Sequence, residues 1–420
     1  MTPRAFAYWG LACLMVAGAS ARAEDSRSAV AAQDAAEVQA ALQDSREGEV
    51  EHVERALRFS VPPEDKARLT ALALSGGGQW GAFGAGFLKG WGERTTDTRP
   101  SFDVVTGTST GALISTFAFL ASAPCGQSPC DPPSCGGKPC DEQIIQQYLA
   151  IKHDGDVYSN RFFLSLLWAD SLTTRPQFRK RLDAAITAEM VKRVGEEGTR
   201  GRVLLVGATD ILSGKFHYFD LTRTAKVFNY TRSAKEKEKL RQEYIDKLMA
   251  SSAIPVQFPP VWLRDTPKWR PSLYVDGGAR RNVFLEGLGR FAKAQGREFK
   301  IYCLMNGARG VDRVTRDDLQ RGVNIKNMAT RSVEILLDES TEGNLIRIYL
   351  ELQQLGYQHG EAVYAGIPKT VAEDCRVKAA AQDTNFSYGV MKCLSDAGEQ
   401  FAQEDTAKVW HANPLDASPY

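Results

Sequence analysis

The chain has 420 residues, of which 43% are hydrophobic and 25% are charged, a composition typical of a globular protein with a sizeable core rather than a disordered one. Its 52 basic and 51 acidic residues nearly cancel. A balanced charge excludes a global field that would attract nucleic acid or an anionic membrane. We therefore expect no nucleic-acid partner, and other partners have to be inferred from local features.

The N-terminus has the order of a secretory signal peptide. Arg4 precedes an apolar run over residues 5–17, and Ala-Arg-Ala at 21–23 follows before acidic Glu24. The run is shorter than the roughly 18 to 20 apolar residues of a membrane-spanning helix. We predict cleavage after residue 23 and export to the periplasm or beyond. An uncleaved anchor or a cytosolic amphipathic end is the alternative, and a lipoprotein through Cys13 is less favoured because it would leave apolar residues on the mature chain.

Residues 24–66 are rich in Ala, Gln and Glu and predict a polar helical extension. From residue 67 strands and helices alternate. The apolar patterns predict strands at 68–76, 102–107, 202–212, 214–221, 271–278 and 299–307, and helices at 80–94, 110–122, 141–152, 160–172, 176–194, 235–255 and 325–356. This alternation predicts an α/β fold whose mostly parallel central sheet is covered by helices on both faces.

Seven cysteines follow the predicted signal peptide, and four of them are evenly spaced in a Pro- and Gly-rich loop. An exported chain meets an oxidising compartment, so this loop predicts a disulfide-stapled insertion. Zinc is the alternative, although the thiol spacing lies at the edge of the usual range. Cys375 and Cys393 could pair, which would leave Cys303 as a buried free thiol. The pairing within the loop stays open for Cys125, Cys130, Cys135 and Cys140.

A glycine cluster follows the first predicted strand. Gly76, Gly78 and Gly81 match G-x-G-x-x-G between a strand and a helix, the dinucleotide-binding fingerprint. That fingerprint also needs an acidic residue about 20 positions later to hold a ribose. Asp97 lies in a polar turn and Asp103 begins the next strand, so neither is well placed. A Walker loop is excluded, and a dinucleotide-dependent oxidoreductase remains a weaker alternative.

The second strand runs into Gly107-Thr-Ser109-Thr-Gly111, the G-x-S-x-G turn that lifts a serine nucleophile above a sheet. An ordinary helix-capping serine is the alternative. A nucleophilic serine needs donors for the oxyanion that forms during acyl transfer. The backbone N–H groups of residues 76–78 lie at the start of a helix and are suited to this charge. We expect Gly76, Gly77 and Gly78 to form the oxyanion hole, with Gly77 and Gly78 as the best donors.

The base that would activate Ser109 is not a recognisable histidine. None of the five histidines lies in a setting typical of a catalytic base: His52, His153, His217, His359 and His411. Asp276 directly follows an apolar strand and precedes two glycines, so its side chain should emerge at the carboxyl edge of the sheet, where α/β folds keep their sites. Asp276 is the candidate base, and an ordinary turn aspartate is the alternative.

Three motifs in this order, G-G-G-x-x-G, G-x-S-x-G and D-G-G, resemble the patatin-like phospholipase family, as do residues 99–115 and 250–261. The resemblance covers about residues 69–284, and more weakly 330–356. It implies a three-layer α/β/α sandwich and a lipid acyl hydrolase with a Ser109–Asp276 dyad, without histidine, cofactor or metal. Where the family often has a basic residue this chain has Trp80, which removes a phosphate-holding contact and leaves esters other than phospholipids open.

The predicted organisation is a signal peptide (1–23), a helical extension (24–66), a hydrolase domain (67–365) with a Cys-rich insertion (124–141), and a C-terminal extension (366–420). The sequence does not indicate an oligomeric state. One predicted helix carries an apolar stripe that could line an acyl channel or touch a membrane surface transiently, or else face the core. Its residues are Phe162, Phe163, Leu166, Leu167 and Trp168. A noncatalytic lipid-binding or storage protein on the same fold is the main functional alternative.

Overall fold

The structure is a computed structural model that describes residues 68–123, 134–135, 137–160, 170–263, 272–285, 287–307, 325–357, 361–379 and 386–414. The predicted signal peptide, the N-terminal extension and the apolar stripe of the helix predicted at 160–172 lie outside these ranges. Within them, no helix combines the length and the hydropathy needed to span a membrane.

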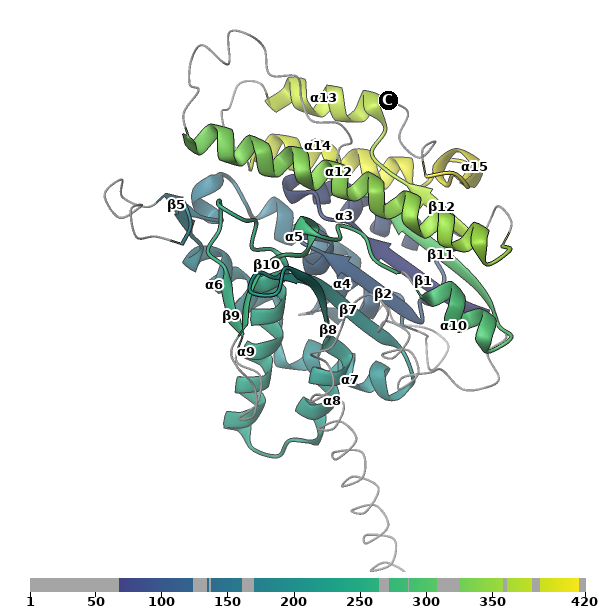
Figure 1. Cartoon of the computed structure of the whole chain (residues 1–420), viewed down its shortest axis with the longest axis horizontal. Helices are drawn as coiled ribbons and strands as arrows, with labels where there is room; N and C mark the ends of the chain where they lie inside the picture. Colours follow the sequence, from purple (N-terminus) through teal and green to yellow (C-terminus); the bar gives the residue numbers. More distant parts are fainter. Residues whose placement is uncertain are drawn as a thin grey trace, which may run out of the picture.

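The centre of the fold is an eight-stranded sheet in the order β12-β11-β1-β2-β7-β10-β9, with β8 paired to β7 (Figure 1). Strands β12, β11, β1, β2 and β7 are parallel, whereas β8 and β10 run antiparallel to β7. The mostly parallel sheet predicted from the sequence is confirmed. The strand bounds are β1 Arg68–Leu74, β2 Val104–Thr108, β7 Val203–Asp210, β8 Lys215–Asp220, β9 Val261–Leu263, β10 Ser272–Asp276, β11 Glu298–Leu304 and β12 Ala362–Ala365.

Both faces of the sheet are buried under helices. Along β1, Leu72 and Leu74 enter one core, whereas Leu69, Ala71 and Ala73 enter a second core on the opposite face. Helices that contribute to the first core include α3 Gly81–Gly92, α4 Thr110–Ala121, α5 Cys140–Leu149, α7 Ala188–Thr199, α8 Leu221–Tyr230, α9 Ala234–Ser251, α13 Lys369–Ala379 and α14 Tyr388–Phe401. Helices of the second are α10 Leu288–Ala294 and α12 Ile325–Gln354, the long green helix that runs along the sheet in Figure 1. The three-layer α/β/α sandwich is confirmed.

Helix α14 packs closely against α3. A Cβ atom on Gly86 would lie 1.9 Å from the carbonyl oxygen of Ser395, and one on Gly90 would lie 2.2 Å from that of Glu399. Glycine is therefore needed at both positions of α3, because any side chain would push the backbones apart. Through α14, residues from the C-terminal part of the chain enter the first core: Val390, Met391 and Leu394.

Several helices differ from the sequence-based expectation, and α10, α13 and α14 lie where no helix was predicted. The single helix predicted at 176–194 is two helices, α6 Pro176–Ala185 and α7, because the Thr187 hydroxyl accepts from the Met190 amide at 3.2 Å and caps a new helix. Helix α8 was also not predicted. It begins where the Asp220 carboxylate accepts from the Arg223 amide at 2.9 Å.

Two disulfides form among the described residues. Cys375–Cys393 joins α13 to α14 and confirms the expected pair, and Cys303 is buried and forms no disulfide, as predicted. Cys135–Cys140 closes the end of the Cys-rich loop, so these two thiols are unavailable to zinc. The other two cysteines of that loop lie outside the described residues. Disulfides are typical of an oxidising compartment. The described ranges contain no group of three or more His, Cys, Asp or Glu side chains suited to a metal ion.

Candidate active site

Ser109 lies on a sharp turn between β2 and α4. Its backbone has φ 54° and ψ −123°, a conformation that L residues other than glycine rarely adopt, and its side chain is nearly buried. The flanking glycines permit the turn. A Cβ on Gly107 would lie 2.4 Å from the Gly111 carbonyl oxygen, and one on Gly111 would lie 2.3 Å from that of Leu74. The sequence pattern therefore forms the strained strand-to-helix turn expected for a nucleophilic serine above a sheet.

Asp276 lies near the end of β2, where Ser109 follows, but it comes from β10, which runs in the opposite direction to β2. It is the last residue of β10 and pairs with Ala208 of β7, whereas Thr108 at the end of β2 pairs with the neighbouring Gly207. Strands β2 and β10 thus share one side of β7 and meet end to end. The expected location at the carboxyl edge of the parallel strands is correct, but Asp276 arrives there on an antiparallel strand. Gly277 makes this possible, because a Cβ there would lie 2.5 Å from the Gly207 carbonyl oxygen.

The structure brings Asp276 and Ser109 into contact in a buried setting. Asp276 is 1% exposed. Burial raises the pKa of Asp276 to about 6, while the nearby Ser109 hydroxyl, the Gly278 amide and the positive field of Arg175 lower this pKa. The Gly278 amide donates to Oδ1 at 2.8 Å. Oδ2 is buried and accepts no hydrogen bond from the described residues, and Ser109 is the hydroxyl-bearing side chain that acts on this carboxylate.

The glycine loop lies beside the serine. A Cβ on Gly76 would lie 2.9 Å from the Ser109 Cβ. The Gly76 amide is already engaged, because it donates to Asn282 Oδ1 at 2.9 Å. Gly78 has φ +57°, and a Cβ atom there would have nothing within 4 Å. Of the three expected oxyanion donors, Gly77 and Gly78 are therefore the two whose amides make no hydrogen bond to the described residues.

Asn282 was not singled out from the sequence. Its side-chain oxygen holds the Gly76 amide across 206 positions of sequence, and its Nδ2 donates to Thr341 Oγ1 of α12 at 2.6 Å. Its own amide donates to Asn344 Oδ1 at 2.7 Å. The glycine loop is thus tied to α12 through this residue. Its position shortly after D-G-G is a weak signal, because nothing local indicates which backbone group an asparagine will bind.

The histidines lie elsewhere in the described parts of the chain. His153 is on the surface, with a side chain that is 67% exposed. His217 packs against the rings of Phe219 and Tyr274, and His411 pairs through its backbone with Tyr364. The side chains that act on Asp276 are those of Ser109 and Arg175. His52 and His359 are outside the described residues.

An α/β/α sandwich with a serine on a strand-to-helix turn, a glycine loop beside it and a buried aspartate against it defines a hydrolase-type site. A family model described as patatin-like phospholipase matches residues 72–288, just over half of the chain. The chain belongs to this family, which confirms the resemblance drawn from its motifs and replaces the oxidoreductase alternative. Membership implies lipid acyl hydrolase activity and a lipid substrate.

No match was found among curated proteins. Among solved structures the chain is similar to VipD from Legionella pneumophila, with 12% identity and a TM-score of 0.30 over 80% of this chain and 67% of that one. A similarity this distant adds nothing to the description of the site.

Proposed function

We propose that the protein is a serine hydrolase that cleaves lipid acyl esters, of the phospholipase A or lysophospholipase type, through a Ser109–Asp276 dyad. The observation that carries this proposal is the contact of the Ser109 hydroxyl with a carboxylate whose pKa is raised by burial to about 6. A carboxylate with an ordinary pKa is a weak base toward a hydroxyl, whereas a desolvated one is better matched to the task.

The reaction would proceed in two halves. Asp276 takes the proton of Ser109 Oγ as that oxygen attacks the ester carbonyl carbon, and the Gly77 and Gly78 amides stabilise the negative oxygen of the tetrahedral intermediate. Asp276 returns the proton to the departing alcohol, which leaves an acyl-serine. Water then attacks the acyl group with Asp276 again as base, and release of the carboxylic acid restores Ser109.

The family supports a lipid substrate, and the residue type at position 80 indicates which head groups to consider. Trp80 is partly buried beside the glycine loop, where its amide donates to the Gly77 carbonyl at 3.1 Å. A neutral indole supplies no ionic contact to a phosphate. We therefore extend the proposed substrates to neutral lipid esters such as triacylglycerol and to short acyl esters.

We infer that the protein acts outside the cytoplasm, after loss of residues 1–23, as a periplasmic or secreted enzyme whose hydrolase domain spans 67–365. The two disulfides support this location. Mass spectrometry of the mature N-terminus tests it. A chain that begins at Glu24 agrees with the inference, and a mature chain that retains residues 1–23 contradicts it.

The test of the reaction is an ester panel with p-nitrophenyl esters and phospholipids. Ser109→Ala should lower kcat by about 10⁴-fold or more, and Asp276→Asn nearly as much, because the nucleophile and its base act as one unit. A fluorophosphonate probe should label the wild type and not Ser109→Ala. Ser115→Ala removes another buried hydroxyl from α4, bonded to the Ala112 carbonyl at 2.7 Å, and should leave kcat unchanged. Wild-type protein that stays folded and hydrolyses no ester would favour the noncatalytic alternative.

A further inference from the structure

The end of α9 lies between the two halves of the dyad. The Ser109 amide donates to Ser251 Oγ at 3.1 Å, and the Asp276 amide donates to the Ala253 carbonyl at 2.8 Å. One three-residue stretch, 251–253, thus binds the backbones of both residues. We call this stretch the brace. A side chain is positioned by the backbone from which it projects, so the brace sets how the hydroxyl and the carboxylate approach each other.

Ser251 is itself fixed to the sheet. It is fully buried, and its hydroxyl donates to the Gly207 carbonyl at 2.5 Å while it accepts from the Ser109 amide. The loop after Asp276 packs on the same carbonyl oxygen through Gly277. A residue with the backbone conformation of Ser109 is strained and keeps that conformation only if its surroundings hold it. The bond to Ser251 is one of the contacts that do so.

Arg175 holds the brace from the other side. Its guanidinium is 3% exposed and donates to the Ser252 carbonyl at 2.7 Å and to the Met249 carbonyl at 3.1 Å. It also lies over the Phe258 ring at 4.7 Å. Carbonyls of a final helical turn have no partner within the helix, and a cation there is favoured by the helix dipole. Arg175 therefore closes the end of α9 where the brace begins.

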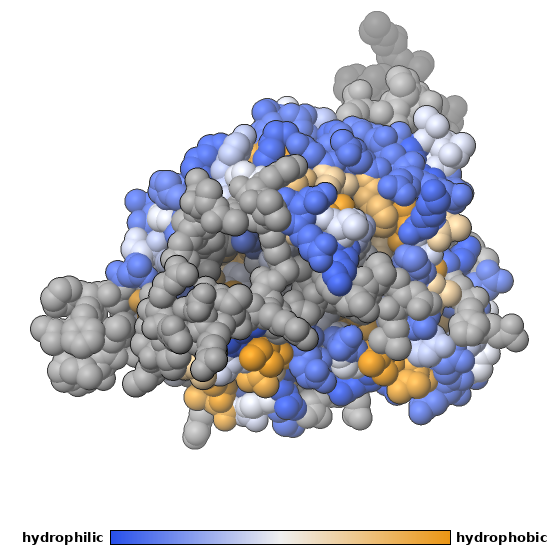
Figure 2. All heavy atoms as spheres, turned by 90° about the horizontal axis from the view of Figure 1, so that it is seen from above, coloured by the Kyte–Doolittle hydropathy of each residue, from blue (hydrophilic) through white to orange (hydrophobic). Residues whose placement is uncertain are grey.

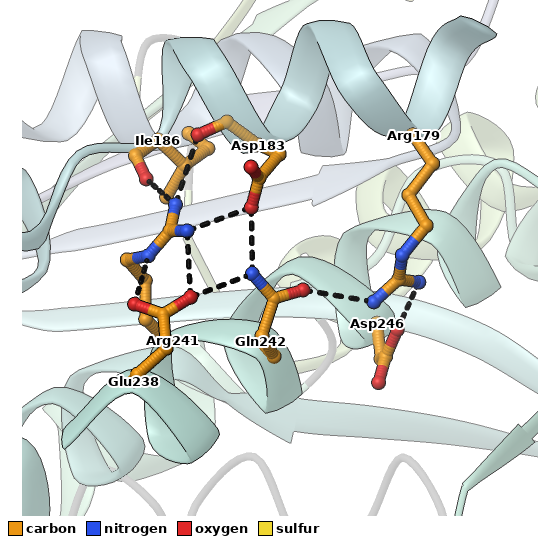
Figure 3. Close-up of polar contacts among 7 residues, drawn as sticks. All are labelled: Arg179, Asp183, Ile186, Glu238, Arg241, Gln242 and Asp246. Carbon is orange, nitrogen blue, oxygen red and sulfur yellow. Dashed lines mark hydrogen bonds and ion pairs between the residues drawn. The ribbon is translucent and has the colours of Figure 1, made fainter. Parts of the chain in front are cut away.

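A second arginine clamps the opposite end of the same helix pair. Arg241 of α9 donates to the last carbonyls of α6, those of Asp183 and Ile186, at 2.9 and 2.8 Å (Figure 3). Arg175 immediately precedes α6, so α6 and α9 run antiparallel with an arginine across each end. Both arginines donate hydrogen bonds to carbonyl groups near the end of a helix, but of the two only Arg175 donates to the brace. Arg241 is therefore a matched control.

We propose that Ser251 and Arg175 are positioning residues, which act through the brace to fix Ser109 against Asp276. This inference rests on the proposed hydrolase function. Neither residue touches the reacting atoms, so their loss should impair the chemical step rather than substrate binding. They were not among the candidate residues predicted from the sequence, although the brace lies within the 250–261 segment.

The first test compares buried serines with a soluble p-nitrophenyl ester. Ser251→Ala should lower kcat by about 10²-fold with KM little changed, as expected when a reacting group is misplaced by about 1 Å. Ser115→Ala loses one buried hydroxyl without contact to the brace and should keep the wild-type kcat. Thermal unfolding of both variants separates loss of stability from loss of positioning.

The second test uses the arginines and the pH dependence of kcat/KM. The groups that lower the pKa of Asp276 are the Ser109 hydroxyl, the Gly278 amide and the positive charge of Arg175. Loss of this positive charge removes an influence that lowers the pKa of Asp276, so Arg175→Met should move the acidic limb of the profile to higher pH. Arg175→Lys keeps the positive charge, so the acidic limb of its profile should lie at the same pH as that of the wild type. Arg241→Met should lower the melting temperature and leave both kcat and the limb unchanged.

The outcomes separate this inference from the proposed function. Ester hydrolysis that does not depend on Ser109 would overturn both. Hydrolysis that depends on Ser109, with Ser251→Ala as active as Ser115→Ala, would overturn the positioning role alone. If the acidic limb of the kcat/KM profile lies at the same pH in Arg175→Met and Arg241→Met, Arg175 has no positioning role. If Arg175→Met does not fold, Ser251→Ala still tests the positioning role of the brace through kcat and KM.

Discussion

Asp276 is a carboxylate placed where a carboxylate is unfavourable. Desolvation is the largest influence on it and raises its pKa, and the hydrogen bonds and the field of Arg175 offset this only in part. The same burial that makes Asp276 a stronger base therefore destabilises the folded chain at neutral pH. Function and stability are opposed at this residue.

The pH dependence of the reaction should report this pKa. A base has to be deprotonated to accept the Ser109 proton, so kcat/KM should rise with pH through about 6, the pKa of Asp276, and level off above it. A pH–rate profile from 4 to 9 on a neutral ester measures this. An acidic limb near the ordinary aspartate value, about 3.9, would contradict the buried setting of the base.

The free energy of unfolding should fall with rising pH over the range in which kcat/KM rises. Because the pKa of Asp276 is higher in the folded chain, the folded state binds this proton more tightly than the unfolded state does. Stability is then lost as pH rises from 3.8, the ordinary pKa, to about 6, by about 1.4 kcal/mol for each pH unit between these values. Asp276→Asn should therefore unfold at a higher temperature than wild type at pH 8, and the gap should narrow toward pH 4. Calorimetry at both pH values checks this, and a variant less stable at pH 8 would refute it.

At the scale of helices, pairs are held either by close backbone contact or by polar clamps. Helices α6 and α9 illustrate the clamp. In Figure 3, Arg241 and Gln242 donate to the carboxylates of both Asp183 and Glu238, and Arg179 pairs with Asp246 further along the two helices. Hydrogen bonds from Arg241 and Gln242 lower the pKa of Glu238 to about 2, so this network should weaken as pH falls below the ordinary glutamate range. On the face drawn in Figure 2, the described residues are mostly hydrophilic, with separate apolar patches between them.

Helices α3 and α14 illustrate the close contact. Gly86→Ala would place a methyl group 1.9 Å from the Ser395 carbonyl oxygen, so α14 has to move away from α3. We expect a loss of about 1–3 kcal/mol in the free energy of unfolding, as for other overpacked cores. Gly343→Ala in α12 has nothing within 4 Å and should stabilise by up to about 1 kcal/mol. Urea denaturation compares the two, and equal stability would contradict the close packing of α3 and α14.

At the scale of the molecule, the C-terminal part of the chain completes the core that carries the site. Helix α14 packs on α3, and α3 follows the glycine loop directly. The Ser387 amide donates to Gln79 Oε1 at 3.1 Å, which joins the start of α14 to that loop. The Cys375–Cys393 disulfide ties α13 to α14 and so restrains this whole region.

Removal of the Cys375–Cys393 disulfide should lower the stability of the folded chain. Its cysteines are 18 positions apart, for which loop-closure entropy gives about 3 kcal/mol of stabilisation. Cys375→Ser with Cys393→Ser should lower the melting temperature clearly. The matching pair at Cys135 and Cys140, only 5 positions apart, should cost less. Melting curves with and without dithiothreitol test this, and equal losses for the two pairs would contradict it.

The sequence by itself determined the features that depend on nearby residues. Alternating apolar residues predicted the strands, and the G-x-S-x-G and D-G-G patterns located Ser109 and Asp276, because steric demands of tight turns act within a few positions. Tertiary structure decided the rest. It made β10 antiparallel and engaged the Gly76 amide with Asn282, 206 positions away. It also placed Ser251 against Ser109 across 142 positions. Such partners depend on how distant segments pack, and a hydroxyl or amide shows no preference among them in sequence.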